Sequence, residues 1–144
     1  MKLRILLAAV LSLCLGTTMA FAGTMPNLVG DWKASGNGAA VVMGKLGHAE
    51  PTKDAQFLSV QPDFTLRINK QDGQRLHGEK FSPKSKETVL GLIDDDGKSI
   101  YMVDDDGVYI CTYDKIKDSL KTRYMEPGLE SKVVSILVFT RVKK

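Results

Sequence analysis

Two copies of Asp-Asp-Asp-Gly, at 94–97 and 104–107, place six aspartates within fourteen residues. Carboxylate oxygens are the ligands that Ca²⁺ prefers, but an EF-hand loop alternates its ligands and ends in a bidentate Glu, which is absent here. Asp-Gly is also a strong signal for a two-residue hairpin turn. A strand of about seven residues between the turns would separate them by roughly 23 Å, too far to share one ion. We therefore interpret both as solvated turns and predict no metal site.

His77 and Glu79 form a candidate acid–base pair, because residues two apart on a strand share a face. A pair that faces solvent beside Arg75 is the simpler interpretation, and the only other histidine is His48. No nucleophile motif accompanies the pair. The glycines of 36–40 lack the third glycine and the helix that a dinucleotide site requires, so no cofactor is predicted.

The four tyrosines, Tyr101, Tyr109, Tyr113 and Tyr124, are the other candidate site residues. Tyr109 and Tyr113 share a strand face with Cys111, for which we expect burial. If the tyrosines point inward, their hydroxyls need partners, which a polar ligand could supply. If they point outward, they form an aromatic patch suited to a subunit interface in a homo-oligomer. The sequence leaves both arrangements open.

These residues fall on strands, because two-residue alternation of apolar and polar side chains runs through the chain. Eight strands are predicted, at about 28–36, 57–70 (broken by Pro62-Asp63), 74–81, 88–93, 98–103, 107–113, 118–125 and 132–142. Short turns rich in Gly and Asp join most of them and favour antiparallel neighbours. The predicted fold is all-β, an eight-stranded antiparallel up-and-down meander barrel, which removes both sheet edges. Residues 36–54 are expected to form a long Gly-rich loop at its entrance.

The N-terminus has the pattern of an export signal. Lys2 and Arg4 precede the apolar run 5–16, and Ala20-Phe21-Ala22 forms an A-x-A cleavage site. We predict a signal peptide at 1–22, a single domain at 23–144 and a periplasmic or extracellular location. A lipoprotein anchored at Cys14 is the alternative, disfavoured by the bulky Leu13.

Removal of that signal peptide would take the 20 basic residues to 18, against 17 acidic ones. Such a balance shows no basic footprint for nucleic acid. No second hydrophobic segment is long enough to be a transmembrane helix.

Two short motifs resemble the calycin superfamily, and its avidin/streptavidin branch most of all. Gly30-Asp31-Trp32 opens the first strand as a G-x-W motif, and Phe139-Thr140-Arg141-Val142-Lys143 closes the last. The resemblance implies a lipocalin-like barrel in which Gly30 and Trp32 close one end and Arg141 is a partner for the indole. It does not extend to the biotin site, because Ala34, Gly36–Gly38 and Leu137 stand at polar ligand positions and Trp32 is the only tryptophan.

The predicted function is that of an exported β-barrel that binds a small apolar or amphipathic ligand. The residues assigned to binding are Tyr109, Tyr113, Tyr124 and Trp32. One alternative is a structural or protein-interaction barrel whose core is filled and which takes no small molecule. The other is a barrel enzyme that uses His77 and Glu79, for which both side chains must line a pocket.

Overall fold

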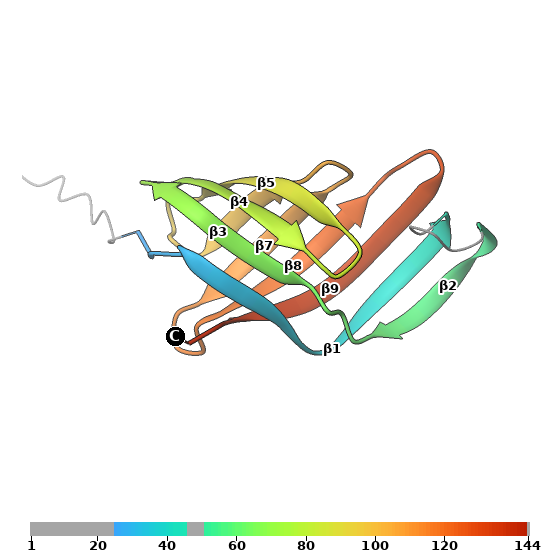
Figure 1. Cartoon of the computed structure of the whole chain (residues 1–144), viewed down its shortest axis with the longest axis horizontal. Helices are drawn as coiled ribbons and strands as arrows, with labels where there is room; N and C mark the ends of the chain where they lie inside the picture. Colours follow the sequence, from blue (N-terminus) through green and yellow to red (C-terminus); the bar gives the residue numbers. More distant parts are fainter. Residues whose placement is uncertain (1–24, 46–50, 144) are drawn as a thin grey trace, which may run out of the picture.

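The computed structural model describes residues 25–45 and 51–143, so the predicted signal peptide, Cys14 and His48 lie outside the described residues. The described chain is all-β (Figure 1). Its strands are β1 (Gly30–Gly44), β2 (Thr52–Val60), β3 (Thr65–Asp72), β4 (Arg75–Phe81), β5 (Lys86–Ile93), β6 (Ser99–Val103), β7 (Val108–Asp114), β8 (Ser119–Glu126) and β9 (Ser131–Arg141). Across 25–45 and 51–143, there is no helix of the length and apolarity that spanning a membrane requires.

Eight of the strands form a closed antiparallel barrel. Strands β3 to β9 pair in chain order, and β1 closes the ring by pairing with both β3 and β9. Trp32 on β1 is opposite Leu66 of β3 on one side and Arg141 of β9 on the other. This confirms the predicted up-and-down barrel and fits a calycin-like fold.

The core follows from the alternation along each strand, because successive side chains point to opposite sides of a sheet. On β6, for example, Ile100 and Met102 are buried while Tyr101 and Val103 are exposed. Cys111 of β7 is 1% exposed, as expected, and burial raises the pKa of its thiol to about 12. The barrel interior is therefore apolar over much of its length.

Most of the described part of the predicted loop 36–54, residues 36–45 and 51–54, forms strand, and 46–50 lie outside the described residues. Strand β1 continues through it to Gly44 and bends at Gly36, where φ is 73° and the register with β9 shifts. A Cβ atom on Gly38 would lie 2.9 Å from the backbone oxygen of Ile136 and 2.3 Å from Leu137 Cδ2, so glycine allows the close approach of β9. The prediction was wrong because glycines that permit a β-bulge have the same sequence signature as glycines of a loop.

Strand β2 lies outside the barrel ring. It pairs only with the second half of β1, from Gly38 to Gly44, whose other side pairs with β9. The three strands form a sheet that extends from one end of the barrel (Figure 1). The predicted strand 57–70 is thus two elements, β2 and β3, separated at Pro62-Asp63.

The two Asp-Asp-Asp-Gly segments form turns at opposite ends of β6. Gly97 N donates to Asp94 O at 3.0 Å in the first, and Asp104 N donates to Gly107 O at 3.2 Å in the second. The prediction of two turns around one strand is confirmed. The second turn faces the end from which β2 extends, and the first faces the opposite end.

Candidate functional site

One end of the barrel is closed by Trp32. Its side chain is fully buried, and its Nε1 donates to Leu28 O at 2.9 Å. The guanidinium of Arg141 lies 4.0 Å from the centre of the indole, and the ring of Tyr113 meets it edge-on at 6.1 Å. A cation over an indole face is a favourable contact. These contacts leave the indole no room for a ligand.

Arg141 also holds the chain that crosses this end. Its Nη1 and Nη2 donate to Val29 O and Asn27 O, both at 2.8 Å, and its Nε donates to Asp118 Oδ2 at 2.8 Å. Asp118 in turn accepts a hydrogen bond from Tyr113 at 3.1 Å. The fork of donors on the guanidinium is therefore occupied by backbone oxygens and a carboxylate of the same chain.

Gly30 and Gln71 complete the closed end. Gly30 has a φ of 134°, a conformation that favours glycine, and a Cβ there would lie 3.5 Å from Arg141 Nη1. Gln71 accepts from Leu28 N and donates to Pro26 O, both at 2.8 Å. The segment before β1 is therefore held across the barrel end from both sides.

The opposite end is open and contains a cavity of about 650 Å³. The second half of β1, with β2 and β9, forms one wall, and the β4–β5 hairpin with β7 and β8 forms the other. The apolar lining residues are Ala40, Val42, Leu58, Val60, Pro62, Phe64, Val133, Leu137 and Phe139. The polar side includes Lys80, Glu87, Asp106, Tyr109, Thr122, Tyr124 and Glu126. An apolar pocket with a few convergent polar groups is the usual form of a small-molecule site.

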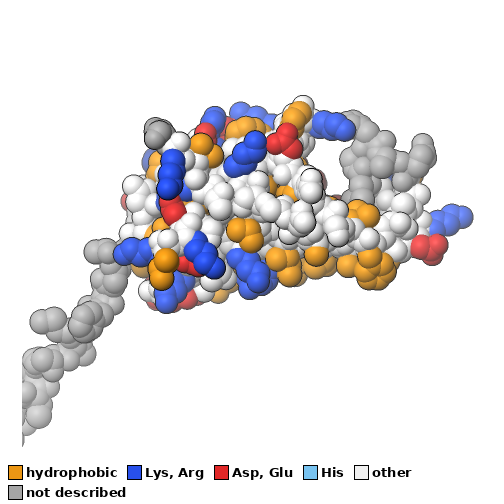
Figure 2. All heavy atoms as spheres, turned by 90° about the horizontal axis from the view of Figure 1, so that it is seen from below, with side chains coloured by type: hydrophobic (Ala, Val, Ile, Leu, Met, Phe, Trp, Pro, Cys, Tyr) orange, Lys and Arg blue, Asp and Glu red, His pale blue; other side chains and the backbone are white. Residues whose placement is uncertain are grey.

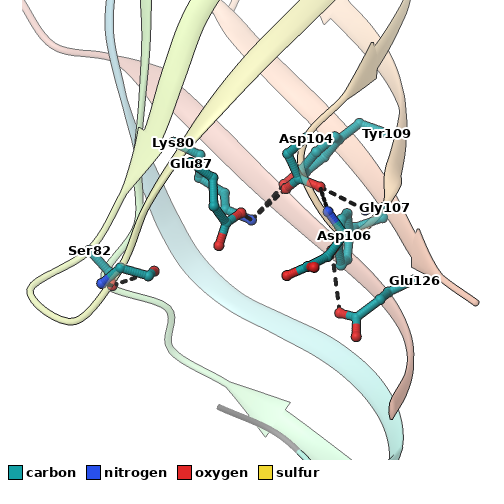
Figure 3. A network of polar contacts seen from close by, with 10 residues as sticks. Lys80, Ser82, Glu87, Asp104, Asp106, Gly107, Tyr109 and Glu126 are labelled. Carbon is teal, nitrogen blue, oxygen red and sulfur yellow. Dashed lines mark hydrogen bonds and ion pairs between the residues drawn. The ribbon is translucent and has the colours of Figure 1, made fainter. Parts of the chain in front are cut away.

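Lys80 is the centre of a polar network at the inner end of this cavity (Figure 3). Its Nζ lies 2.7 Å from Asp104 Oδ2, from Glu87 Oε2 and from the Tyr109 hydroxyl. Tyr109 donates its own proton to Asp104. Two of the three ammonium hydrogens are used in hydrogen bonds to Asp104 and Tyr109, and Glu87 lies at ion-pair distance.

The two carboxyl groups that contact Lys80 have pKa values shifted in opposite directions. Burial alone would raise the pKa of Asp104, but hydrogen bonds from Lys80 and Tyr109 lower it on balance. For Glu87, burial raises the pKa by more than the contact with Lys80 lowers it. Glu87 Oε2 is buried, and its contact with Lys80 is an ion pair without the alignment of a good hydrogen bond. The network thus holds one carboxyl group whose pKa is lowered and one whose pKa is raised.

Aromatic rings surround the same ammonium. Lys80 Nζ lies 5.1 Å from the ring centre of Tyr124, 5.5 Å from that of Tyr109 and 5.7 Å from that of Phe64. The two tyrosine rings are 4.7 Å apart, and Tyr124 donates to Glu126 Oε2 at 3.3 Å. The ring faces therefore stabilise a buried positive charge that the carboxyl groups also contact.

The tyrosines, whose direction the sequence left open, do not all point the same way. Tyr109, Tyr113 and Tyr124 point into the barrel and have protein partners for their hydroxyls. Tyr101 points outward, is 49% exposed and donates to Asp94 at 3.2 Å.

The predicted binding residues are split between the two ends. Tyr109 and Tyr124 line the cavity, whereas Tyr113 and Trp32 belong to the closed end. Four residues along β7 separate the two inward tyrosines of that strand by roughly 13 Å. The structure therefore does not bring the four predicted residues into one site.

The second acidic turn corrects the prediction that both turns are solvated. Asp95 and Asp96 are exposed in the first turn, but the Asp104 side chain is 0% exposed and bound to Lys80. The two-residue alternation of β6 could have predicted this burial, because Asp104 continues the inward series of Ile100 and Met102. The same alternation places Lys80 on the inward side of β4 and Glu87 on the inward side of β5, but neither residue was predicted from it.

His77 and Glu79 lie on the outer face of β4. The inward residues of that strand are Leu76 and Gly78, and His77 is exposed. Glu79 forms ion pairs with Lys86 at 2.5 Å and Arg67 at 3.8 Å. The pocket that the enzyme alternative requires around both side chains is not formed, and that alternative is withdrawn.

Within 25–45 and 51–143, no cluster of three or more His, Cys, Asp or Glu has the arrangement of a metal site. Comparison with known proteins adds no relative: no protein-family model, no curated protein and no solved structure matches the chain.

Proposed function

We propose that this chain is an exported binding protein, and that a small amphipathic ligand occupies the cavity at the open end of the barrel. The observation that carries the proposal is the cavity of about 650 Å³, which lies within the usual range for ligand sites. The alternative of a filled core fits the closed end but leaves this volume unexplained.

The two sides of the cavity support an amphipathic ligand rather than a purely apolar one. Side chains such as Val42, Val133 and Leu137 offer an apolar surface, which favours a hydrocarbon body by about 25 cal/mol per Å² removed from water. Glu87, Tyr124 and Glu126 offer hydrogen-bonding groups on the facing side. A bound molecule would satisfy both sides only with a polar end.

Membership of the calycin superfamily is part of the proposal. It is supported by the G-x-W motif at the closed end and by the arginine of the last strand over that tryptophan. The export signal is supported by the sequence of 1–22 alone.

Binding can be tested with Nile red, a neutral apolar dye, and by native mass spectrometry of the purified protein for a retained ligand. We expect saturable dye fluorescence with one site per chain. Trp32 is a poor reporter because it is fully buried at the other end. A Leu58→Trp variant places a second indole beside the cavity, where Leu58 is 40% exposed.

The matched control fills the cavity. Ser135→Phe adds a ring to a lining residue of β9, whereas Thr140→Phe adds one to an exposed residue of the same strand. Ser135→Phe should abolish dye binding, and Thr140→Phe should retain it. Equal binding by both variants, or no saturable binding by the natural chain, would contradict the proposal.

A protein-interaction barrel is the second candidate function, favoured by an apolar outer surface on β1, β2 and β9. Phe57 is 82% exposed there, beside exposed Val41, Val134 and Ile136. In Figure 2, hydrophobic side chains gather along the side of the molecule to which β2 extends. Sedimentation of the natural chain and of Phe57→Ser tests this candidate. A monomer in both would remove self-association.

A further inference from the structure

We propose that the ligand carries a positive charge, as an amine or ammonium group on an apolar body, and that the group binds at the acidic rim of the open cavity. This inference rests on the proposed function, since it concerns the same cavity. It names the chemical class of the ligand from the charges that the cavity presents.

The first observation is the excess of carboxyl groups in the lining. Lys80 is the one basic residue among the described residues that line the cavity, against Glu87, Asp106 and Glu126. Asp104 adds a further carboxylate directly behind the lining, in contact with Lys80. Even with Glu87 protonated, the negative groups outnumber the positive one. A cation therefore enters a favourable field, and an anion enters an unfavourable one.

The second observation is that Lys80 cannot serve an anionic ligand without breaking the network. Its Nζ donates hydrogen bonds to Asp104 and Tyr109, lies 2.7 Å from Glu87 as an ion pair, and belongs to a side chain that is only 14% exposed. A ligand carboxylate would have to displace one of these partners and leave a buried acceptor unsatisfied. The single positive charge of the cavity is thus already neutralised.

The third observation concerns the surroundings of the Tyr124 hydroxyl. Burial raises the pKa of this phenol, and the charges of Asp104, Glu126 and Glu87 raise it further. Carboxyl groups from three different segments therefore act on the same point of the cavity wall. Figure 3 shows the carboxyl groups of Asp106 and Glu126 on the same side of the network.

The geometry gives the ligand a direction. The rim carboxylates belong to the turn before β7 and to the end of β8, while Val42, Leu58 and Val133 line the wall opposite. A charged group at the rim would leave the hydrocarbon body against that wall.

The test compares three probes of equal chain length, octylamine, 1-octanol and octanoate, as competitors of Nile red at pH 7. The amine is protonated at that pH and the acid is ionised. We expect octylamine to bind about tenfold more tightly than 1-octanol, the value of one charge-assisted hydrogen bond, and octanoate to bind most weakly. The preference should decrease with added salt.

The outcomes separate this inference from the proposed function. Displacement by 1-octanol or octanoate with equal or weaker displacement by octylamine would overturn the inference and leave a binding cavity. Failure of Nile red and all three probes to bind would overturn both.

Variants of the rim carboxylates test whether the amine binds at these residues. Glu126→Gln and Asp106→Asn should each reduce the ratio of octylamine to 1-octanol affinity by about threefold or more, because each removes one charge near the amine. Asp105→Asn is the matched control, since Asp105 is the exposed neighbour in the same turn but does not line the cavity. An equal loss in Asp105→Asn would show a general effect of net charge and contradict binding at the rim.

Discussion

The two ends of the barrel are built from the same kinds of groups and have opposite properties. Each has a cation, aromatic rings and carboxylates: Arg141 with Trp32 and Asp118 at the closed end, and Lys80 with Tyr109 and Asp104 at the open end. One end has no ligand space beside its indole, whereas the other borders about 650 Å³. The types of residue therefore do not determine which end can bind.

The difference lies in what each cation contacts. Arg141 reaches two backbone carbonyls of the segment before β1 and fixes that segment across the barrel. Lys80 instead contacts side chains of the barrel wall, namely those of Glu87, Asp104 and Tyr109 and the rings of Phe64 and Tyr124. A planar guanidinium can serve several fixed acceptors at once, whereas an ammonium is a compact charge that several carboxyl groups can surround. The contacts of Arg141 hold a chain segment across one end of the barrel, whereas those of Lys80 hold no described segment across the other end.

The largest effect is expected for Trp32→Ala. It should lower the free energy of unfolding by about 4 kcal/mol, because a fully buried indole and its contacts are removed. Urea unfolding measures this. If the variant does not fold, Trp32→Phe keeps a ring, loses the bond to Leu28 O and should cost about 1 kcal/mol. Dye binding at the open end should persist in any folded variant, and its loss would show that the two ends are not independent.

At the open end, the corresponding variant is Asp104→Ala, which removes the carboxylate that contacts Lys80. It leaves the ammonium of Lys80 buried without its principal carboxylate, which should lower the free energy of unfolding by about 3 kcal/mol. The double variant Lys80→Met, Asp104→Leu should recover most of this loss, because it removes both charges together. A double variant as unstable as Asp104→Ala would mean that packing, rather than an unpaired charge, is responsible.

Arg141→Lys tests the importance of the guanidinium fork. The charge remains, but the contacts with Asn27 O, Val29 O and Asp118 cannot all be kept, so we expect a loss of about 2 kcal/mol. Thermal unfolding with Lys121→Arg as the control for an exposed cation measures it. Unchanged stability would show that charge alone closes this end.

The smallest effect is a pH dependence from Glu87. Because its pKa is raised in the folded protein, the folded state binds more protons, and stability should fall as the pH rises above the unfolded value of about 4.5. Asp104 acts in the opposite direction and only at lower pH, since its pKa is lowered. Urea unfolding between pH 5 and 8 should show a decline that is smaller in Glu87→Gln. An equal decline in both would contradict this assignment.

The fold was predictable because the alternation and the Asp-Gly turns are local signals. The bend of β1 was not, because Gly38 is explained by its close approach to β9, about a hundred residues away, and Gly36 by the positive φ at the bend itself. The cavity residues were only partly predictable. Tyr109 and Tyr124 were predicted as binding residues because they are aromatic. Asp104 was assigned to a solvated turn because its neighbours in the chain are Asp and Gly.

The contact between Trp32 and Arg141 was expected from the resemblance to the calycin superfamily. The eight-stranded barrel and the turns around β6 follow from the amino-acid sequence alone. These features depend on side-chain periodicity and on backbone conformations that particular residues favour. The choice of the open end, by contrast, depends on contacts between strands that are distant in the chain. That result depends on the glycine bend that carries β1 out of the barrel and on the inward positions of Lys80, Glu87 and Asp104. Their burial is set by strands that are distant in the sequence, so no local pattern could reveal it.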